Sequence, residues 1–236
     1  MTLNRRNALL AALALPAACA TRALPPFAAT AIPPPGGSRS LRAPVVGQSW
    51  TYRKLDFFNS GLLDVVQETV TSVAPTIDVA RHANSGAVLA HEAHAAWGQL
   101  LRDPAWDYPM TFDMPVPLWP PSLAEGARTT VNSHYHMDGG SFRYWVQVHC
   151  VVRGWERVTV SAGTFDTLRI DRLIRLEHHD FTRVYTLRRD TMWLSLDVGR
   201  WVARETYGEY RHAGGSFVLL DFSREDRFHW ELTAWQ

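Results

Sequence analysis

The fold is decided by residues 155–168, WERVTVSAGTFDTL. Two runs rich in β-branched and aromatic residues flank Ala162-Gly163, a dipeptide that suits a tight hairpin. A connection this short joins antiparallel strands, because parallel strands need a crossover of a dozen or more residues. Apolar residues in and after the second run have even spacing, which places them on one face of a strand: Leu168, Ile170, Ile174 and Leu176.

Similar runs recur from Val45 onward and predict further strands. They cover residues 48–53, 64–73, 76–81, 87–94, 129–137, 141–152, 156–160, 164–176, 182–187, 200–207, 217–222 and 227–235. Glycine-rich turns at 138–140 and 213–215 predict further hairpins. Residues 87–101 are the best candidate for a helix. The sequence therefore predicts a mainly β protein, a single large curved antiparallel β-meander in the form of a half-barrel or open barrel.

Residues 103–126, DPAWDYPMTFDMPVPLWPPSLAEG, interrupt the strand pattern. Six prolines make regular structure unfavourable there and predict a long loop. The loop also carries large aromatic residues: Trp106, Tyr108, Phe112 and Trp119. In one interpretation they pin the loop to the core. In the other, the loop borders the mouth of an apolar cavity and these four residues bind a ligand there.

The beginning of the chain predicts export. Asn4-Arg5-Arg6-Asn7 precedes an uncharged run at 8–15 that is too short to span a bilayer, so residues 1–18 are predicted to be a signal peptide. The paired arginines are compatible with the twin-arginine route as well as the general route. Cys19 follows two alanines and resembles the lipidation site of bacterial lipoproteins. We expect a lipid on Cys19 that anchors the protein to a membrane, in the periplasm or cell envelope.

The remaining chain divides into a tether and one domain. Residues 19–44 are rich in Pro, Ala, Gly and Ser, which predicts an extended tether. Residues 45–236 then form the β domain. Cys150 lies in an apolar run and is the only cysteine besides Cys19, so we expect a buried, unreactive thiol.

The charge balance argues against nucleic acid as a partner. The whole chain has 24 basic and 23 acidic residues. Removing residues 1–18 leaves 22 basic and 23 acidic residues, because Arg5 and Arg6 are lost. A protein that grips phosphate backbones needs a strong basic excess, which this chain lacks.

No catalytic residue, metal site or cofactor is predicted. His134 and His136 share a strand face and His91 and His94 are three residues apart, but neither pair belongs to a set of four ligands. The chain has no Gly-x-Ser-x-Gly motif and no glycine-rich phosphate loop. Glu225-Asp226 lies in a charged segment that we expect to be solvated. A pair of glycosidase carboxylates needs no sequence motif, so an enzyme stays an open alternative.

The hairpin has a resemblance to a known group. Residues 154–168 are similar to a hairpin in uncharacterised proteobacterial envelope proteins of the DUF3108-like group, although Ser161 stands where that group usually has proline. Residues 192–202, MWLSLDVGRWV, and residues 46–52, VGQSWTY, resemble two further strands of the same group. The resemblance implies a curved antiparallel sheet like that of periplasmic lipoprotein carriers, and it transfers no catalytic residue.

These observations leave three hypotheses for function. The first is a non-catalytic envelope protein that binds an apolar small molecule or an envelope protein on its curved sheet. The second is an exported hydrolase of glycans or esters, and the third is a structural subunit of an envelope assembly. An open apolar cleft would favour the first, facing carboxylates in a polar cleft the second, and a filled interior with a flat exposed patch the third.

Overall fold

The computed structural model describes residues 27–37, 39–106, 108–213, 222–225 and 227–236. Every regular element in these ranges is a strand. The strands are β1 (Ala29–Ala31), β2 (Ser49–Asp56), β3 (Leu62–Ser72), β4 (Ile77–Ala83), β5 (Val88–Ala96), β6 (Gln99–Asp103), β7 (Met110–Pro117), β8 (Arg128–Met137), β9 (Tyr144–Val160), β10 (Gly163–Leu176), β11 (Arg183–Ser195), β12 (Arg200–His212), β13 (Ser223–Arg224) and β14 (Phe228–Trp235).

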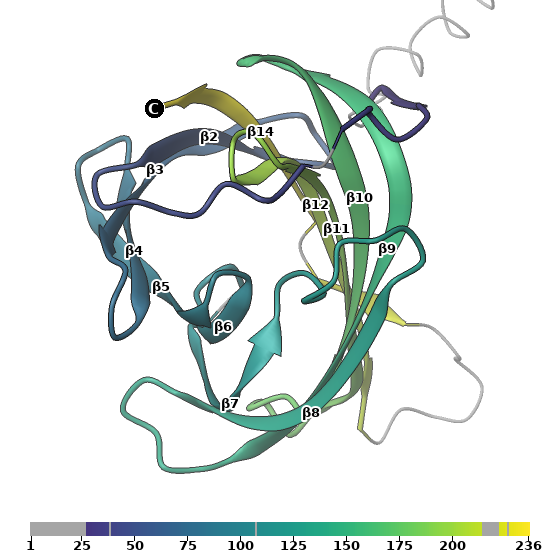
Figure 1. Cartoon of the computed structure of the whole chain (residues 1–236). Helices are drawn as coiled ribbons and strands as arrows, with labels where there is room; N and C mark the ends of the chain where they lie inside the picture. The colour runs from purple at the N-terminus through teal and green to yellow at the C-terminus, as the bar shows by residue number, and fades with distance from the viewer. Residues whose placement is uncertain (1–26, 38, 107, 214–221, 226) are drawn as a thin grey trace, which may run out of the picture.

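The sheet closes on itself as an antiparallel barrel (Figure 1). The strand order around the ring is β9-β10-β11-β12-β14-β2-β3-β4-β5-β6-β7-β8, and β8 pairs with β9 to complete it. Two short strands lie outside the ring: β1 pairs with β9, and β13 pairs with β12. The predicted curved antiparallel meander is confirmed, and its curvature goes as far as closure.

The predicted hairpin joins the two longest paired strands. β9 and β10 pair from Gly163 opposite Val160 to Leu176 opposite Val146, with a bulge between Arg169 and Ile170. Gly163 has φ of 137°, which a side chain would strain. The evenly spaced apolar residues of β10 are all buried in the barrel core, as predicted: Leu168, Ile170, Ile174 and Leu176.

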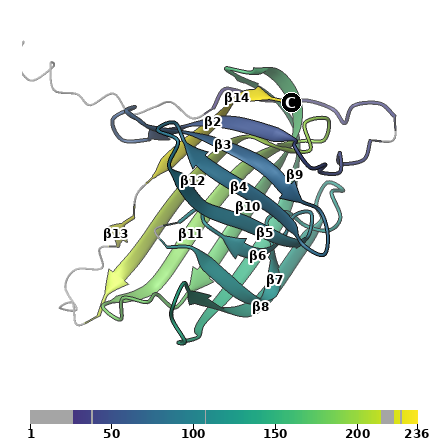
Figure 2. The ribbon, with the colours of Figure 1, turned by 90° about the vertical axis from the view of Figure 1, so that its left-hand side faces the viewer.

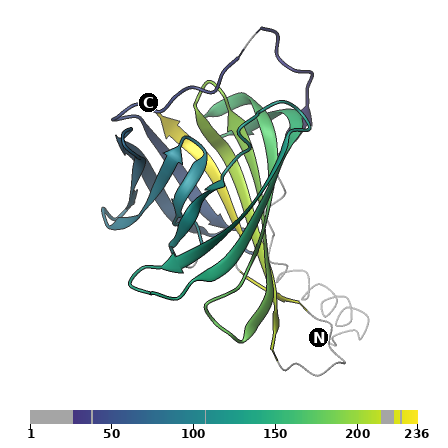
Figure 3. The same ribbon diagram turned by 60° about the horizontal axis from the view of Figure 1, so that its bottom comes forward.

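The barrel has two different ends. One carries the β9–β10 turn, the β11–β12 turn and the C-terminus, and it lies at the top of Figure 2. The other carries the β8–β9 connection at 138–143 and the β10–β11 connection at 177–182, and Figure 3 brings it forward. We call this second end the aromatic end, for the exposed residues described below.

Residues 87–101 form no helix. They make up β5 and the start of β6, which Gly98 connects with φ of 86°. Apolar and polar residues alternate loosely here, and pairing of β5 with β4 and β6 overrides the helical propensity of its alanines.

The expectation of an irregular loop over residues 103–126 is wrong in part, because β7 lies within it. β7 pairs with β6, and it pairs with β8 only at residues 110–112. Pro115 and Pro117 follow that short pairing, so neither removes a hydrogen-bond donor from the β7–β8 ladder. β7 therefore stops pairing with β8 before its prolines, while its pairing with β6 continues as far as Pro117.

The described part of residues 19–44 lies against the barrel and does not stand apart from it. β1 pairs Ala29 with Val158 of β9, and Phe27 stacks on His229 with 3.5 Å between the ring centroids. The backbone N–H of Arg42 donates to the carbonyl of Leu196. We call residues 27–44 the strap. The signal peptide, Cys19 and most of the strand predicted at 217–222 lie outside the described residues, as do residues 214–215 of the predicted turn.

Candidate functional site

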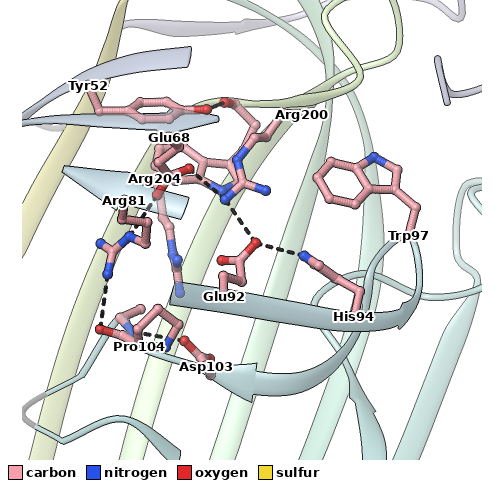
Figure 4. Close-up of polar contacts among 12 residues, drawn as sticks. Tyr52, Glu68, Arg81, Glu92, His94, Trp97, Asp103, Pro104, Arg200 and Arg204 are labelled. Atoms are coloured by element: carbon pink, nitrogen blue, oxygen red, sulfur yellow. Dashed lines mark hydrogen bonds and ion pairs between the residues drawn. The ribbon is translucent and has the colours of Figure 1, made fainter. Parts of the chain in front are cut away.

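A network of buried charges occupies the barrel interior (Figure 4). It consists of Arg81, Arg172, Arg200, Arg204, Glu68, Glu92, Asp103, Asp190 and the imidazole of His94. Each guanidinium is matched by a carboxylate, so the set is neutral when His94 is neutral. Charged groups are buried only when such pairing offsets the loss of hydration.

Arg200 lies at the centre of one half of the network. Its Nη2 is 2.6 Å from Oε2 of Glu68 on β3 and 2.9 Å from Oε1 of Glu92 on β5. Its guanidinium also lies 5.1 Å from the ring centroid of Trp50 and 5.4 Å from that of Trp97. Burial alone would lower the pKa of Arg200, but Glu68 and Glu92 raise it. Arg200 is therefore a permanent cation between two carboxylates and two indoles.

Glu92 is held ionised. Its burial raises the carboxyl pKa, but Arg200 and a 2.7 Å contact between Oε1 and Nε2 of His94 outweigh burial, so the pKa is lowered. Nearby Tyr52 donates its hydroxyl to the carbonyl of Trp201, and burial raises its pKa well above the usual value. A carboxylate with a lowered pKa is a poor general acid, and this one is sealed from solvent.

The other half of the network joins β6, β7, β10, β11 and β12. Asp190 on β11 accepts from Arg204 Nη2 at 2.6 Å and from Arg172 Nη1 at 3.3 Å. Arg172 also donates to Asp103 at 3.3 Å and to the carbonyl of Pro117 at 2.9 Å. All of these partners are buried, so the arrangement links opposite walls of the barrel.

The network was missed at the sequence level, although a signal was present. Arg200 and Arg204 occupy inward positions on β12, among the apolar residues Trp201, Val202 and Ala203. A charge on the buried face of a strand is rare and needs a partner. Nothing local in the sequence shows that the partners are the distant Glu68, Glu92 and Asp190.

A second feature lies on the outside, at the aromatic end. Large aromatic side chains are exposed there on three connected segments: Phe142, Trp145, Phe181, Tyr185 and Phe222. Phe181 and Tyr185 are 71% and 76% exposed, which is unusual for residues of this size. These five residues are the aromatic patch.

Two adjoining pockets of about 430 and 390 Å³ lie among these side chains. Leu176, Glu177 and Tyr185 line both pockets and separate one from the other. The first also has Phe142 and Phe181 in its wall, with 6.0 Å between their ring centroids. A single elongated apolar molecule could contact both pockets, because they share these three lining residues.

Tyr185 has a strained backbone. Its φ is 53°, in the left-handed region that a bulky side chain rarely adopts, and the β11–β12 register shifts between Val184 and Leu187. The irregularity turns the Tyr185 ring outward beside the pockets. Strain of this kind gathers at binding sites, where the surrounding structure maintains it.

The four aromatic residues predicted to bind a ligand divide into two groups. Trp106, Phe112 and Trp119 are buried in the hydrophobic core. Tyr108 is half exposed, and its ring lies 4.4 Å from that of His179, next to the pocket residue His178. The structure therefore places only Tyr108 near the aromatic patch, and ligand binding by the other three stays a prediction.

The remaining candidates have structural surroundings of their own. Within the described ranges no three His, Cys, Asp or Glu side chains form a group that could hold a metal ion. Cys150 is buried, and burial raises its thiol pKa to about 12. Glu225 is not solvated as expected: it is buried, and Arg188 Nε donates to its Oε2 at 2.8 Å. Asp226 lies outside the described residues. Over the same parts of the chain, no helix combines the length and apolar character that a bilayer crossing requires.

Comparisons with known proteins support the fold. No protein-family model matches the chain, and no curated protein matches its sequence. A provisionally assigned lipoprotein of Parabacteroides distasonis has a TM-score of 0.52 at 13% identity, over 85% of this chain and 100% of its own. A provisionally assigned exported protein of Bacteroides fragilis has a TM-score of 0.51 at 12% identity, over 84% and 100%. Membership in the DUF3108-like group stays a prediction. At these identities the likeness shows a shared fold, which in the second protein is called YmcC-like.

Proposed function

We propose that this chain is an exported, lipid-anchored, non-catalytic envelope protein that binds an apolar ligand at its aromatic end. The signal anatomy of residues 1–18 and Cys19 supports export and anchoring. The fold neighbours, named as a lipoprotein and an exported protein, agree with this localisation. A periplasmic or envelope location follows from the same proposal.

The aromatic patch is the observation that carries the binding proposal. Phe142, Phe181 and Tyr185 are exposed around two adjoining pockets, where a solvated surface would place polar residues. Leu176 forms a common apolar floor. Covering such a surface with an apolar molecule removes it from water, which supplies the driving force for binding.

The interior supports a non-catalytic role. Glu68, Glu92 and Asp190 are buried and ion-paired with arginines, so none is available as an acid or base for an exported hydrolase. A structural subunit would instead use the aromatic patch to contact another protein. The ligand hypothesis is favoured because concave pockets, which suit a small molecule, lie within the patch.

Binding of N-phenylnaphthylamine, an uncharged dye that fluoresces in apolar surroundings, tests this proposal. Replacing Phe142 and Phe181 by serine should weaken dye binding at least tenfold, because each lost ring removes apolar contact worth about 1.5–3 kcal/mol when fully buried. The melting temperature should stay near that of the wild type, since both rings are largely exposed. Fluorescence titration and a melting curve of the same sample provide both readings.

Val88→Ser is the matched control, because Val88 is 79% exposed at the start of β5, away from the patch. It removes an exposed apolar side chain and should leave dye binding unchanged. Equal dye affinity in the wild type and the Phe142/Phe181 double variant would contradict the proposed site.

A further inference from the structure

A third pocket lies on the outer wall of the barrel and is rich in arginine. It has a volume of about 320 Å³ and lies where β11, β12 and β13 meet the connection to β14. Its lining residues are Phe58, Arg189, Thr191, Glu205, Thr206, Tyr207, Arg224 and Arg227. Three guanidinium groups and one carboxylate therefore face the same small volume.

The positive charge of this pocket is poorly neutralised within the described chain. Arg224 is exposed and forms no ion pair with any residue in the described ranges. Arg189 comes no closer than 3.9 Å to Glu209, and its side chain is 60% exposed. Arg227 stacks on Phe57 with 3.4 Å between the guanidinium carbon and the ring centroid, and it forms no ion pair with the residues that the structure describes.

The one carboxylate of the pocket is already engaged by the strap. The backbone N–H of Phe27 donates to Oε1 of Glu205 at 3.4 Å, and Nδ1 of His229 lies 3.5 Å from the same oxygen. Glu205 thus contacts the strap and His229 as well as facing the arginines. The pocket keeps an excess of positive charge, which favours an anion with several acceptor oxygens.

The strap also places this pocket close to the predicted lipid anchor. Phe27 is eight residues after Cys19 in the sequence. A fully extended chain of eight residues spans at most about 28 Å. If Cys19 carries a lipid in a bilayer, the wall around Glu205 is within that distance of the membrane surface.

We infer that this arginine pocket binds the phosphate of an anionic phospholipid headgroup at the membrane to which the protein is anchored. Arg189, Arg224 and Arg227 supply the donors that planar guanidinium groups present to phosphate oxygens. Phe58, which is exposed at the pocket edge, contacts the apolar part of the lipid. The inference rests on the anchoring part of the proposed function and not on the aromatic patch. The lipid contact would hold one wall of the barrel against the membrane.

Vesicle sedimentation tests the inference without the anchor. The full-length Cys19→Ala variant, purified as a soluble protein, is mixed with vesicles of phosphatidylcholine alone or of phosphatidylcholine with phosphatidylglycerol. We expect sedimentation with the anionic vesicles only. Replacing Arg189 and Arg224 by glutamine should weaken that binding about tenfold or more, since each arginine near an anionic surface contributes about 1 kcal/mol.

Arg128→Gln is the matched control, because Arg128 is exposed on β8 and forms no ion pair with the described residues. It should retain full vesicle binding, and a melting curve confirms that each variant is folded. If the double variant unfolds, Arg224→Gln alone is used, with an expected loss of about fivefold. Equal losses in the Arg128 variant and the pocket variant would overturn the inference in favour of general charge attraction.

Inorganic phosphate separates the lipid from a free ion. We expect millimolar phosphate, at constant ionic strength, to leave vesicle binding nearly unchanged, because many lipid contacts act together on the vesicle. Loss of vesicle binding at that concentration would overturn the lipid assignment and identify a free phosphate site. Because Cys19 is absent from the tested protein, failure here is distinct from failure of lipid anchoring.

Discussion

Gly98 shows how one residue permits the tight turn between β5 and β6. Its φ is 86°, and a Cβ atom added there would lie 2.1 Å from Nε1 of Trp119. The indole of Trp119 therefore packs directly on the glycine. Gly98 allows a backbone conformation and a close contact at the same position.

Gly98→Ala should lower the free energy of unfolding by about 2–4 kcal/mol, from backbone strain together with overpacking against Trp119. Gly86→Ala is the matched control, since Gly86 has φ of 83° and no neighbour within 4 Å of an added Cβ. Gly86→Ala should lower the free energy of unfolding by about 1 kcal/mol. Urea unfolding of both variants measures the difference, and equal losses would show that contact with Trp119 is unimportant.

Trp106 and Trp119 anchor residues 103–126 to the core. Truncating either to alanine should lower the free energy of unfolding by about 3–5 kcal/mol, as for other buried aromatic residues. Tyr108→Ala should cost much less, because the Tyr108 ring is half exposed. Measuring the melting temperature and the dye binding of each variant distinguishes a residue that anchors the core from one that contacts a ligand. A stable Trp119→Ala variant with weakened dye binding would instead support its predicted ligand contact.

Individual residues were predictable from sequence where local chemistry decides their role. Gly163 belongs to a turn, and Cys150 lies in an apolar run, so a hairpin and a buried thiol followed directly. Glu225 was misjudged because its charged neighbours suggested solvent, whereas its partner Arg188 is 37 residues away. The aromatic patch was also missed, because Phe142 and Phe181 become neighbours only when β8–β9 and β10–β11 connections meet at one end.

At the scale of elements, Arg200 joins β12 to β3 and β5 across the interior. These strands are not neighbours in the ring, so their side chains hold opposite walls in a fixed position. Glu92 has a lowered pKa, and its ordinary value is 4.5. The ionised carboxylate of Glu92 therefore stabilises the folded protein. This stabilisation is present above the ordinary pKa of 4.5, and it is lost as the pH falls toward the lowered pKa of the folded state.

Glu92→Gln should lower the free energy of unfolding by about 3–5 kcal/mol at pH 7, because Arg200 loses one of two buried counter-ions. The difference in the free energy of unfolding between the wild type and this variant should become smaller by about 1.4 kcal/mol per pH unit below about pH 4.5. Urea unfolding at a series of pH values measures this. A difference that stays constant down to pH 3 would show that Glu92 does not contribute through its charge.

Strands in which apolar and polar residues alternate strongly were predicted. Strands that form only through pairing with particular neighbouring strands were not. The run at 164–176 predicted β10 almost completely, because its inward residues are continuous and apolar. β7 was missed, since its prolines are tolerated only through one-sided pairing that the sequence does not reveal. β1 was missed because a run of only three residues, Ala-Thr-Ala, becomes a strand by pairing with β9.

For the molecule as a whole, the proposed lipid on Cys19 would determine where the barrel is held. The mature chain should begin at Cys19, take up labelled fatty acid and fractionate with membranes. Cys19→Ala should release an exported soluble form, because a single change removes the lipid attachment. Intact-mass analysis that finds cleavage at another residue and no added lipid would rule out the lipoprotein proposal.

The position of β14 between β12 and β2 determines when the barrel can close. β14 pairs Trp235 with Trp50, so a strand made late in the chain completes a ring that β2 began. Until β14 has left the ribosome or an export channel, β12 and β2 each keep an unpaired edge, which is prone to association with other chains. Closure of this barrel must therefore wait until β14 has been made. A chain that lacks β14 would leave the ring open and should be a substrate for chaperones and proteases.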